Sequence, residues 1–167
     1  MFCCSWRKTT QVSFVASPLQ DAGIVELINA RDVPMFSLNG HSCHAKIVNI
    51  YDGDSCKVIL KFAGSLYQFN CRLAGIDAPE MKPSLRKPLR EIEIAAAVIS
   101  RNRVIELCCN DPVNNTKIIS IDCHKFDKYG RLLITIHADG QNINDLMILE
   151  GHAKKYDGGK KAGFNYA

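Results

Sequence analysis

Apolar and polar residues alternate in several segments of this chain of 167 residues, a pattern typical of β-strands with one buried face. The clearest alternations cover residues 56–62 and 67–73, and a preceding segment takes on the same character from Ala45. Residues 119–123 and 132–136 repeat it later in the chain. The pattern therefore predicts five strands.

The spacing of apolar residues becomes helical between Leu89 and Arg103. Ile92, Ala95, Ala96 and Ile99 would mark one face of that helix. The apolar run over 104–109 can re-enter the sheet as a short strand.

A second, shorter helix is predicted to end near Glu150. Either Asn142 or Asn144 can cap its first turn, because an Asn side chain accepts hydrogen bonds from free backbone N–H groups. Gly151 is positioned to end it. Five strands, with one helix after the third and another after the fifth, describe an α+β fold built on an OB-type five-stranded β-barrel with packed α-helices.

Residues 1–40 show neither period, and we interpret them as an N-terminal extension to a domain spanning 41–167. The extension nevertheless contains apolar residues, at positions 14, 15, 24, 25, 27 and 28. We therefore expect part of it to pack on the barrel or on a second subunit. The oligomeric state stays open.

The net charge of +4 and the pI near 8.6 are compatible with a polyanionic partner but do not establish one. Basic residues gather over 82–90 and 154–161, where solvated surface is the ordinary interpretation. No apolar run reaches membrane-spanning length.

Eight cysteines raise the question of disulfides or zinc. No secretory signal and no Cys-x-x-Cys pair are found, and the dense group His41-Ser-Cys43-His44 matches no common zinc spacing. We therefore expect reduced thiols in an intracellular, cytoplasmic protein, in the host-cell cytoplasm should the protein be viral.

Three motifs carry the chemistry: Asp52-Gly-Asp-Ser55, Arg72-Leu-Ala-Gly-Ile-Asp-Ala-Pro-Glu80 and Asp127-Lys-Tyr-Gly-Arg131. Each alone is an ordinary turn, because Asp, Gly and Pro are turn formers. Together they supply carboxylates suited to a hard cation or a water, and guanidiniums suited to a phosphate.

This set, over residues 45–156, resembles the staphylococcal nuclease (thermonuclease) family. The resemblance implies a calcium site, with magnesium as an alternative, formed by Asp54, Asp77 and the main-chain carbonyl of Ala78. The catalytic residues that it implies are Arg72, Glu80 and Arg131.

The resemblance also implies DNA or RNA as substrate, cut with little sequence preference to leave 3′-phosphate ends. Contacts to the nucleic acid are expected from Lys82, Lys128, Tyr129, Lys154 and Tyr156. The alternative is a non-catalytic module that binds nucleic acid or protein, as some nuclease-like domains do after losing the site. The complete set of two metal carboxylates, one glutamate and two arginines favours the enzyme.

Overall fold

The computed structural model describes residues 28–159 and 163–164. Contacts divide the chain into two units, one ending at Phe36 and the other beginning at Ser37. Among the described residues of the first unit, η1 (Ala30–Asp32) is a short 3-10 helix. The expectation that the apolar residues at 14–27 pack on the barrel or on a second subunit lies outside the described residues.

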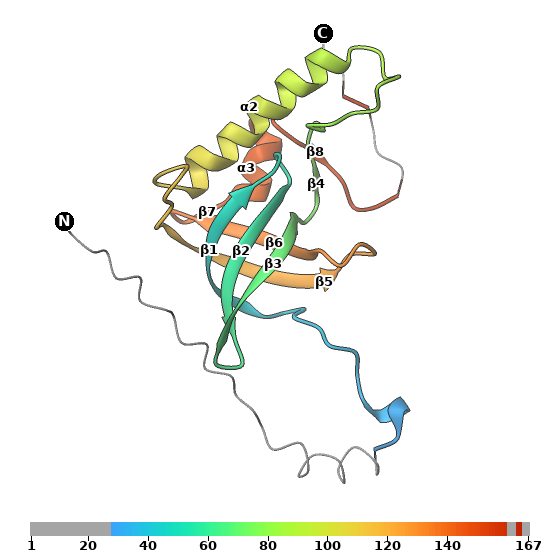
Figure 1. The fold of residues 1–167 in the computed structure, drawn as a ribbon, viewed down its shortest axis with the longest axis vertical. Coiled ribbons are helices and arrows are strands. Elements are labelled where there is room, and N and C mark those ends of the chain that lie inside the picture. Colours follow the sequence, from blue (N-terminus) through green and yellow to red (C-terminus); the bar gives the residue numbers. More distant parts are fainter. Residues whose placement is uncertain (1–27, 160–162, 165–167) are drawn as a thin grey trace, which may run out of the picture. The chain divides into compact units, whose positions relative to one another are not determined.

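The second unit is built on a closed barrel of five strands (Figure 1). Antiparallel pairing runs in the order β3-β2-β1-β5-β6, and a parallel pairing of residues 71–73 with 132–134 joins the two ends. This confirms the predicted OB-type α+β fold. The strands are β1 (Ser42–Ile50), β2 (Ser55–Phe62), β3 (Ser65–Leu73), β5 (Ile118–Phe126) and β6 (Leu132–Ala138).

The barrel interior is filled mainly by apolar residues that the alternation predicted, but Tyr67, expected on the apolar face of residues 67–73, is 48% exposed. Val58 of β2, Ile121 of β5 and Ile134 of β6 are fully buried. Burying each such side chain contributes about 1.5–3 kcal/mol. The inward and outward alternation fixes strand register, because a shift of one residue would turn each apolar set toward solvent.

The predicted first helix is present as α2 (Arg90–Cys108), which lies across one end of the barrel (Figure 1). It is longer than expected, and the predicted strand over 104–109 is wrong. Val104 and Cys108 continue the buried face of the helix. No helix among the described residues is both long and apolar enough to cross a membrane.

The predicted apolar face of α2 is also wrong, since Ile92 and Ile99 are 46% and 58% exposed. The face that packs on the domain instead consists of Glu93, Ala97, Ser100, Val104 and Cys108.

The second helix, α3 (Ile143–Leu149), begins at Asn142, whose side chain accepts a hydrogen bond from Asp145 N. Asn144 has a different role. Its buried amide accepts from Ile136 N and donates to the carbonyls of Ala74 and Ile134. It therefore ties α3 to the place where the barrel closes.

Three two-residue strands complete the unit and were not predicted. β7 (Gln141–Asn142) extends the sheet beside β6, while β4 (Ile76–Asp77) pairs with β8 (Lys154–Lys155). The pairing of β4 with β8 brings the C-terminal segment next to the Asp-Ala-Pro-Glu motif.

The six cysteines within the described residues are free thiols. Burial raises the pKa of Cys71, Cys108 and Cys123 to about 12, which keeps them protonated and unreactive at neutral pH.

Candidate functional site

Arg72 joins the two aspartates that the first two motifs supply. Its Nη1 lies 2.8 Å from Asp54 Oδ1 and its Nη2 lies 2.9 Å from Asp77 Oδ1. All three side chains are buried, with at most 8% of each residue exposed. Burial alone would lower the pKa of Arg72, but the two carboxylates raise it above its ordinary value, so the guanidinium stays charged.

The strand register brings these residues together. Ser55 at the start of β2 pairs with Arg72 on β3, and Leu73 N donates to the Asp54 carbonyl at 2.8 Å. Beyond β4, Ala78 N donates to Asp54 Oδ2 at 3.0 Å. The Asp-Gly-Asp turn is therefore attached to both the barrel and the Asp-Ala-Pro-Glu loop.

A third carboxylate, Asp52, lies buried beside Asp54. Burial and the negative charge of Asp54 together raise the pKa of Asp52 from 3.8 to about 7. With Asp52 ionised, the cluster holds the buried acids Asp52, Asp54 and Asp77 around the buried guanidinium of Arg72. The cluster thus carries uncompensated negative charge.

A hard divalent cation fits this cluster in charge and in ligand chemistry. Calcium and magnesium prefer carboxylate and carbonyl oxygens and complete their coordination with water. Asp54, Asp77 and the Ala78 carbonyl would be the donors. No three His, Cys, Asp or Glu side chains in the described part of the chain converge on one point, so protein carboxylates alone do not form a complete cage.

Asp52 should make the stability of the metal-free protein depend on pH. Because the folded state binds the Asp52 proton more tightly than the unfolded chain, the free energy of unfolding falls as pH rises from 3.8 to about 7. Asp52→Asn keeps an acceptor for Asp54 N but removes the charge. In chelator, we expect this variant to be more stable than the native chain at about pH 8, by on the order of 2 kcal/mol. The difference should shrink as the pH falls and vanish below about pH 3.8, where the carboxyl group is protonated in both the folded and the unfolded state.

Thermal unfolding at the two pH values measures this difference. An equal gain in stability for Asp52→Asn at both pH values would show that the Asp52 charge is not the source of the gain. Added calcium should reduce the stability difference between Asp52→Asn and the native chain at the higher pH, because the cation offsets the negative charge of Asp52.

Gly53, between the two turn aspartates, lies against α2. A Cβ atom at this position would meet Ser100 Oγ and would lie 2.8 Å from Ala78 Cβ. Ser100 is itself held in place, because its hydroxyl donates to the His152 carbonyl at 2.9 Å. Only glycine fits this close approach of turn to helix.

We therefore expect Gly53→Ala to lower the free energy of unfolding by about 1–3 kcal/mol, the usual cost of overpacking. It should also displace Asp54 and reduce any activity of the site. Gly163→Ala is the matched control, because nothing lies within 4 Å of its Cβ position and its φ is not positive. Denaturant unfolding of both variants measures the effect. Equal stabilities would contradict the proposed steric role of Gly53.

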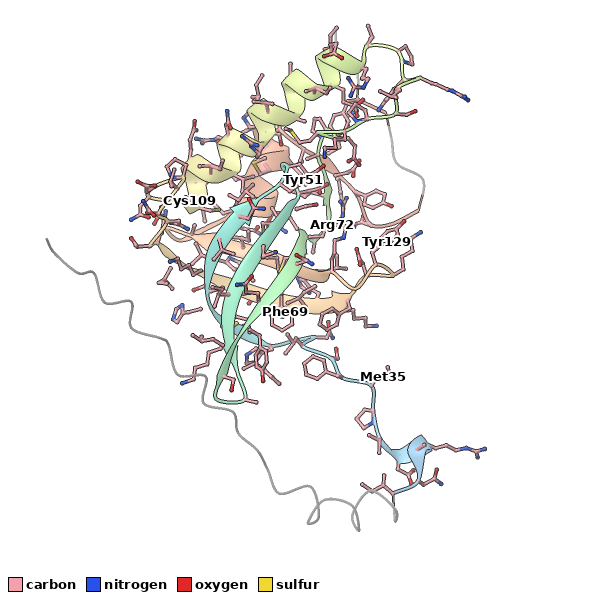
Figure 2. All side chains as sticks on the ribbon, in the orientation of Figure 1. Met35, Tyr51, Phe69, Arg72, Cys109 and Tyr129 are labelled. Carbon is pink, nitrogen blue, oxygen red and sulfur yellow. The ribbon has the colours of Figure 1, made fainter. Side chains whose placement is uncertain are left out.

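A cavity of 1390 Å³ opens beside Arg72. Its wall includes Glu80, which is partly buried, and Arg131 and Tyr129 from the third motif. Figure 2 shows Arg72 and Tyr129 on the same side of the barrel. Residues from all three motifs thus surround one open space.

The third motif forms the bend between β5 and β6 and orients Arg131. Asp127 Oδ2 accepts from Arg131 Nε at 2.8 Å, and Asp127 Oδ1 accepts from the backbone N–H groups of Tyr129 and Arg131. Arg131 and Lys128 both lie over the exposed Tyr129 ring, at 5.6 Å and 5.0 Å.

The remaining expected contacts divide into two groups. Tyr156 lines the cavity, with the Arg72 guanidinium 5.7 Å from its ring centre and its own hydroxyl donating to the Gly159 carbonyl. Lys82 and Lys154 do not line it. Lys82 is exposed in the loop after Glu80, and the Lys154 amine donates to the Gly163 carbonyl.

Several cavity residues, Tyr51 and Asn49 among them, were not singled out from the sequence. Tyr51 is an exposed aromatic residue directly after β1, and its position next to the Asp-Gly-Asp turn was the available signal. Asn49, two residues earlier, carries no sequence signal.

Residues 70–166 match the family model described as staphylococcal nuclease homologue. The match includes Arg72, Asp77, Glu80 and Arg131, whereas the Asp-Gly-Asp turn precedes it. The match covers more than half of the chain, and the barrel with its two helices is consistent with it. The chain therefore belongs to the staphylococcal nuclease homologue family.

Proposed function

We propose that this protein is a metal-dependent nuclease that hydrolyses phosphodiester bonds of DNA, and of RNA, with little sequence preference and leaves 3′-phosphate ends. The observation that carries the proposal is the buried Asp54–Arg72–Asp77 cluster beside a cavity lined by Glu80 and Arg131. Hydrolysis of a phosphodiester needs this mixture of cation ligands, proton acceptor and phosphate-binding groups.

Asp54, Asp77 and the Ala78 carbonyl would hold calcium, or magnesium in its place. When bound, the cation supplies positive charge beside a non-bridging phosphate oxygen. Glu80 accepts a proton from the attacking water or orients it. Arg72 and Arg131 stabilise the negative charge that develops on the phosphoryl group and on the departing 5′ oxygen.

The nucleic acid would be held mainly by groups that bind any sequence. Tyr129 and Tyr156 offer ring faces to bases, and Lys128 offers positive charge to phosphates. Lys82 and Lys154, outside the cavity wall, would contribute at longer range.

A plasmid-degradation assay with and without chelator tests the proposal. We expect degradation with calcium, none in excess chelator, and recovery when calcium is returned. End-group analysis of the products should find 3′-phosphates. Full activity in excess chelator would contradict the metal assignment, and binding of DNA without cleavage under all metal conditions would indicate a non-catalytic module.

A further inference from the structure

A second pocket, of 420 Å³, lies between β1, the C-terminal half of α2 and the loop over 110–115. Its wall contains two cationic side chains, Lys46 and Arg101, together with the amides of Asn49 and Asn114. No Asp or Glu is among the described residues that line it. The pocket is therefore electropositive, and its volume falls within the range of about 300–1,000 Å³ that small-molecule sites occupy.

Arg101 is the central feature of this pocket. Its Nε is buried and has no hydrogen-bond partner among the described residues. A buried donor without a partner lowers the stability of the fold by about 1–3 kcal/mol, or more when the group is charged. Buried donors are therefore nearly always hydrogen-bonded to an acceptor. Two residues along the same helix, Arg103 is by contrast paired with Glu106 and Glu150.

The pocket wall is held in shape without using the cations. Asn115, which is buried, donates to the Ile47 carbonyl at 3.1 Å and accepts from Lys117 N at 3.0 Å. Asp111, the acid in this loop, accepts from the backbone N–H groups of its own turn. Among the described residues, no ion pair joins it to Arg101.

The edge of β1 is open at this place. Pairing with β5 ends at Lys46, and a bulge interrupts the pairing with β2 between Ile47 and Asn49. Bulges at strand edges frequently accompany functional sites, where they redirect side chains.

Asn49 lines both this pocket and the larger cavity beside Arg72. Tyr51, two positions further along, is 46% exposed and also lines the larger cavity. In Figure 2, Tyr51 lies between Arg72 of the candidate site and Cys109 of the second pocket. A nucleic-acid strand that leaves the catalytic cavity would pass the ring of Tyr51 and then the amide of Asn49 before it reached Arg101.

We propose that the second pocket binds a phosphate group of the same nucleic-acid strand whose scissile phosphate occupies the catalytic cavity. This inference rests on the proposed nuclease function. Arg101 offers a fork of N–H donors to phosphate oxygens, and Lys46 adds a compact positive charge. Tyr51 stacks on an intervening base, a contact that tolerates any sequence.

The test compares Lys46→Gln/Arg101→Gln with Lys61→Gln/Lys125→Gln. Both double variants remove two positive charges, and the control pair is exposed and lines neither pocket. Binding is measured by fluorescence anisotropy in a Glu80→Gln background, with calcium present so that the full site is formed. The probes are a dinucleotide and a single strand of about 16 nucleotides, the upper end of what an OB fold covers.

For the pocket variant we expect the Kd of the long strand to rise about tenfold, equivalent to roughly 1.4 kcal/mol. The Kd of the dinucleotide should stay unchanged. The slope of log Kd against log salt should fall by roughly 0.7 for each phosphate that the variant no longer binds. In the control variant the Kd should rise less than about twofold, since its charges act only at long range.

Three outcomes would overturn the inference alone. The pocket variant could lose no more affinity than the control variant, or it could lose equal affinity for both probes. The pocket could also bind inorganic phosphate while the effect of the variant on nucleic-acid binding does not depend on strand length. Absence of nucleic-acid binding by the protein with native Lys46 and Arg101 would instead refute the proposed function together with the inference. Thermal unfolding of each variant verifies that the fold is retained.

Discussion

Replacing Glu80 by Gln is expected to lower kcat by at least about a hundredfold, the low end for a positioned proton acceptor. Glu80 follows the buried segment 76–79 and faces the cavity from a partly exposed position, where a water and a phosphate can both reach it. Gln keeps the size and hydrogen-bonding capacity of the side chain but loses its negative charge and its basicity. The fold should be retained.

The matched control is Glu91→Gln, which removes one exposed carboxylate on α2 away from the cavity wall. Both variants are compared by kcat on saturating DNA with calcium present, and by thermal unfolding. Cleavage by Glu80→Gln at close to the native rate would show that Glu80 neither accepts a proton nor orients the water.

The strands were predictable because each has one face in the barrel core. In residues 56–62 and 119–123 an apolar residue stands at every second position, and in the structure the buried positions 56, 58, 60, 119, 121 and 123 follow this alternation. The closure of the barrel through β3 and β6 was not readable from periodicity, because it joins segments about 60 residues apart.

The buried face of α2 could not be predicted from hydrophobicity. Glu93 is buried with its carboxylate 2.6 Å from the Lys87 amine, and Ser100 is buried because it packs at the Asp-Gly-Asp turn. Both residues are polar, so the hydrophobic pattern predicted that the buried face was the opposite one. In the structure Ile92 and Ile99 on that face are exposed. A helix that packs at a functional site uses small and charged residues on its buried face. The hydrophobic periodicity of the sequence assigns such residues to the solvent-exposed face.

The motifs indicated the residues of the candidate site but not how they contact one another. The resemblance implied a catalytic role for Arg72, and its guanidinium suits a phosphate. The structure adds that this side chain binds Asp54 and Asp77, which are 18 and 5 residues away in sequence. Such contacts depend on strand register and on the β4–β8 pairing, neither of which is encoded locally.

The two arginines should affect stability differently when each is replaced by Lys. Arg72 uses two nitrogens to bind two buried carboxylates, and a Lys ammonium lacks this planar fork. Removing a partner from a buried ion pair costs about 3–5 kcal/mol, so we expect Arg72→Lys to lose part of that. Arg131 is partly exposed and is paired with Asp127, so Arg131→Lys should unfold like the native chain.

Arg131→Lys therefore tests catalysis without a loss of fold. If Arg131 only bound the substrate, KM would rise and kcat would stay near normal. We expect the opposite, a fall in kcat with little change in KM, and the same for Arg72→Lys once its lower stability is accounted for. A guanidinium matches a phosphorus centre that gains charge on its equatorial oxygens, whereas affinity for the ground state can come from any nearby cation.

Other cations near the site are expected to supply the affinity for the ground state. Lys82 and Lys154 lie outside the cavity wall, and we expect them to be interchangeable contacts to the backbone of a long polyanion. Neutralising both should weaken binding and flatten its salt dependence while kcat is unchanged. Steady-state kinetics on DNA over a range of salt concentrations separates the two classes of residue. A change confined to KM in Arg131→Lys would make Arg131 a substrate clamp and would leave Arg72 and Glu80 to stabilise the transition state.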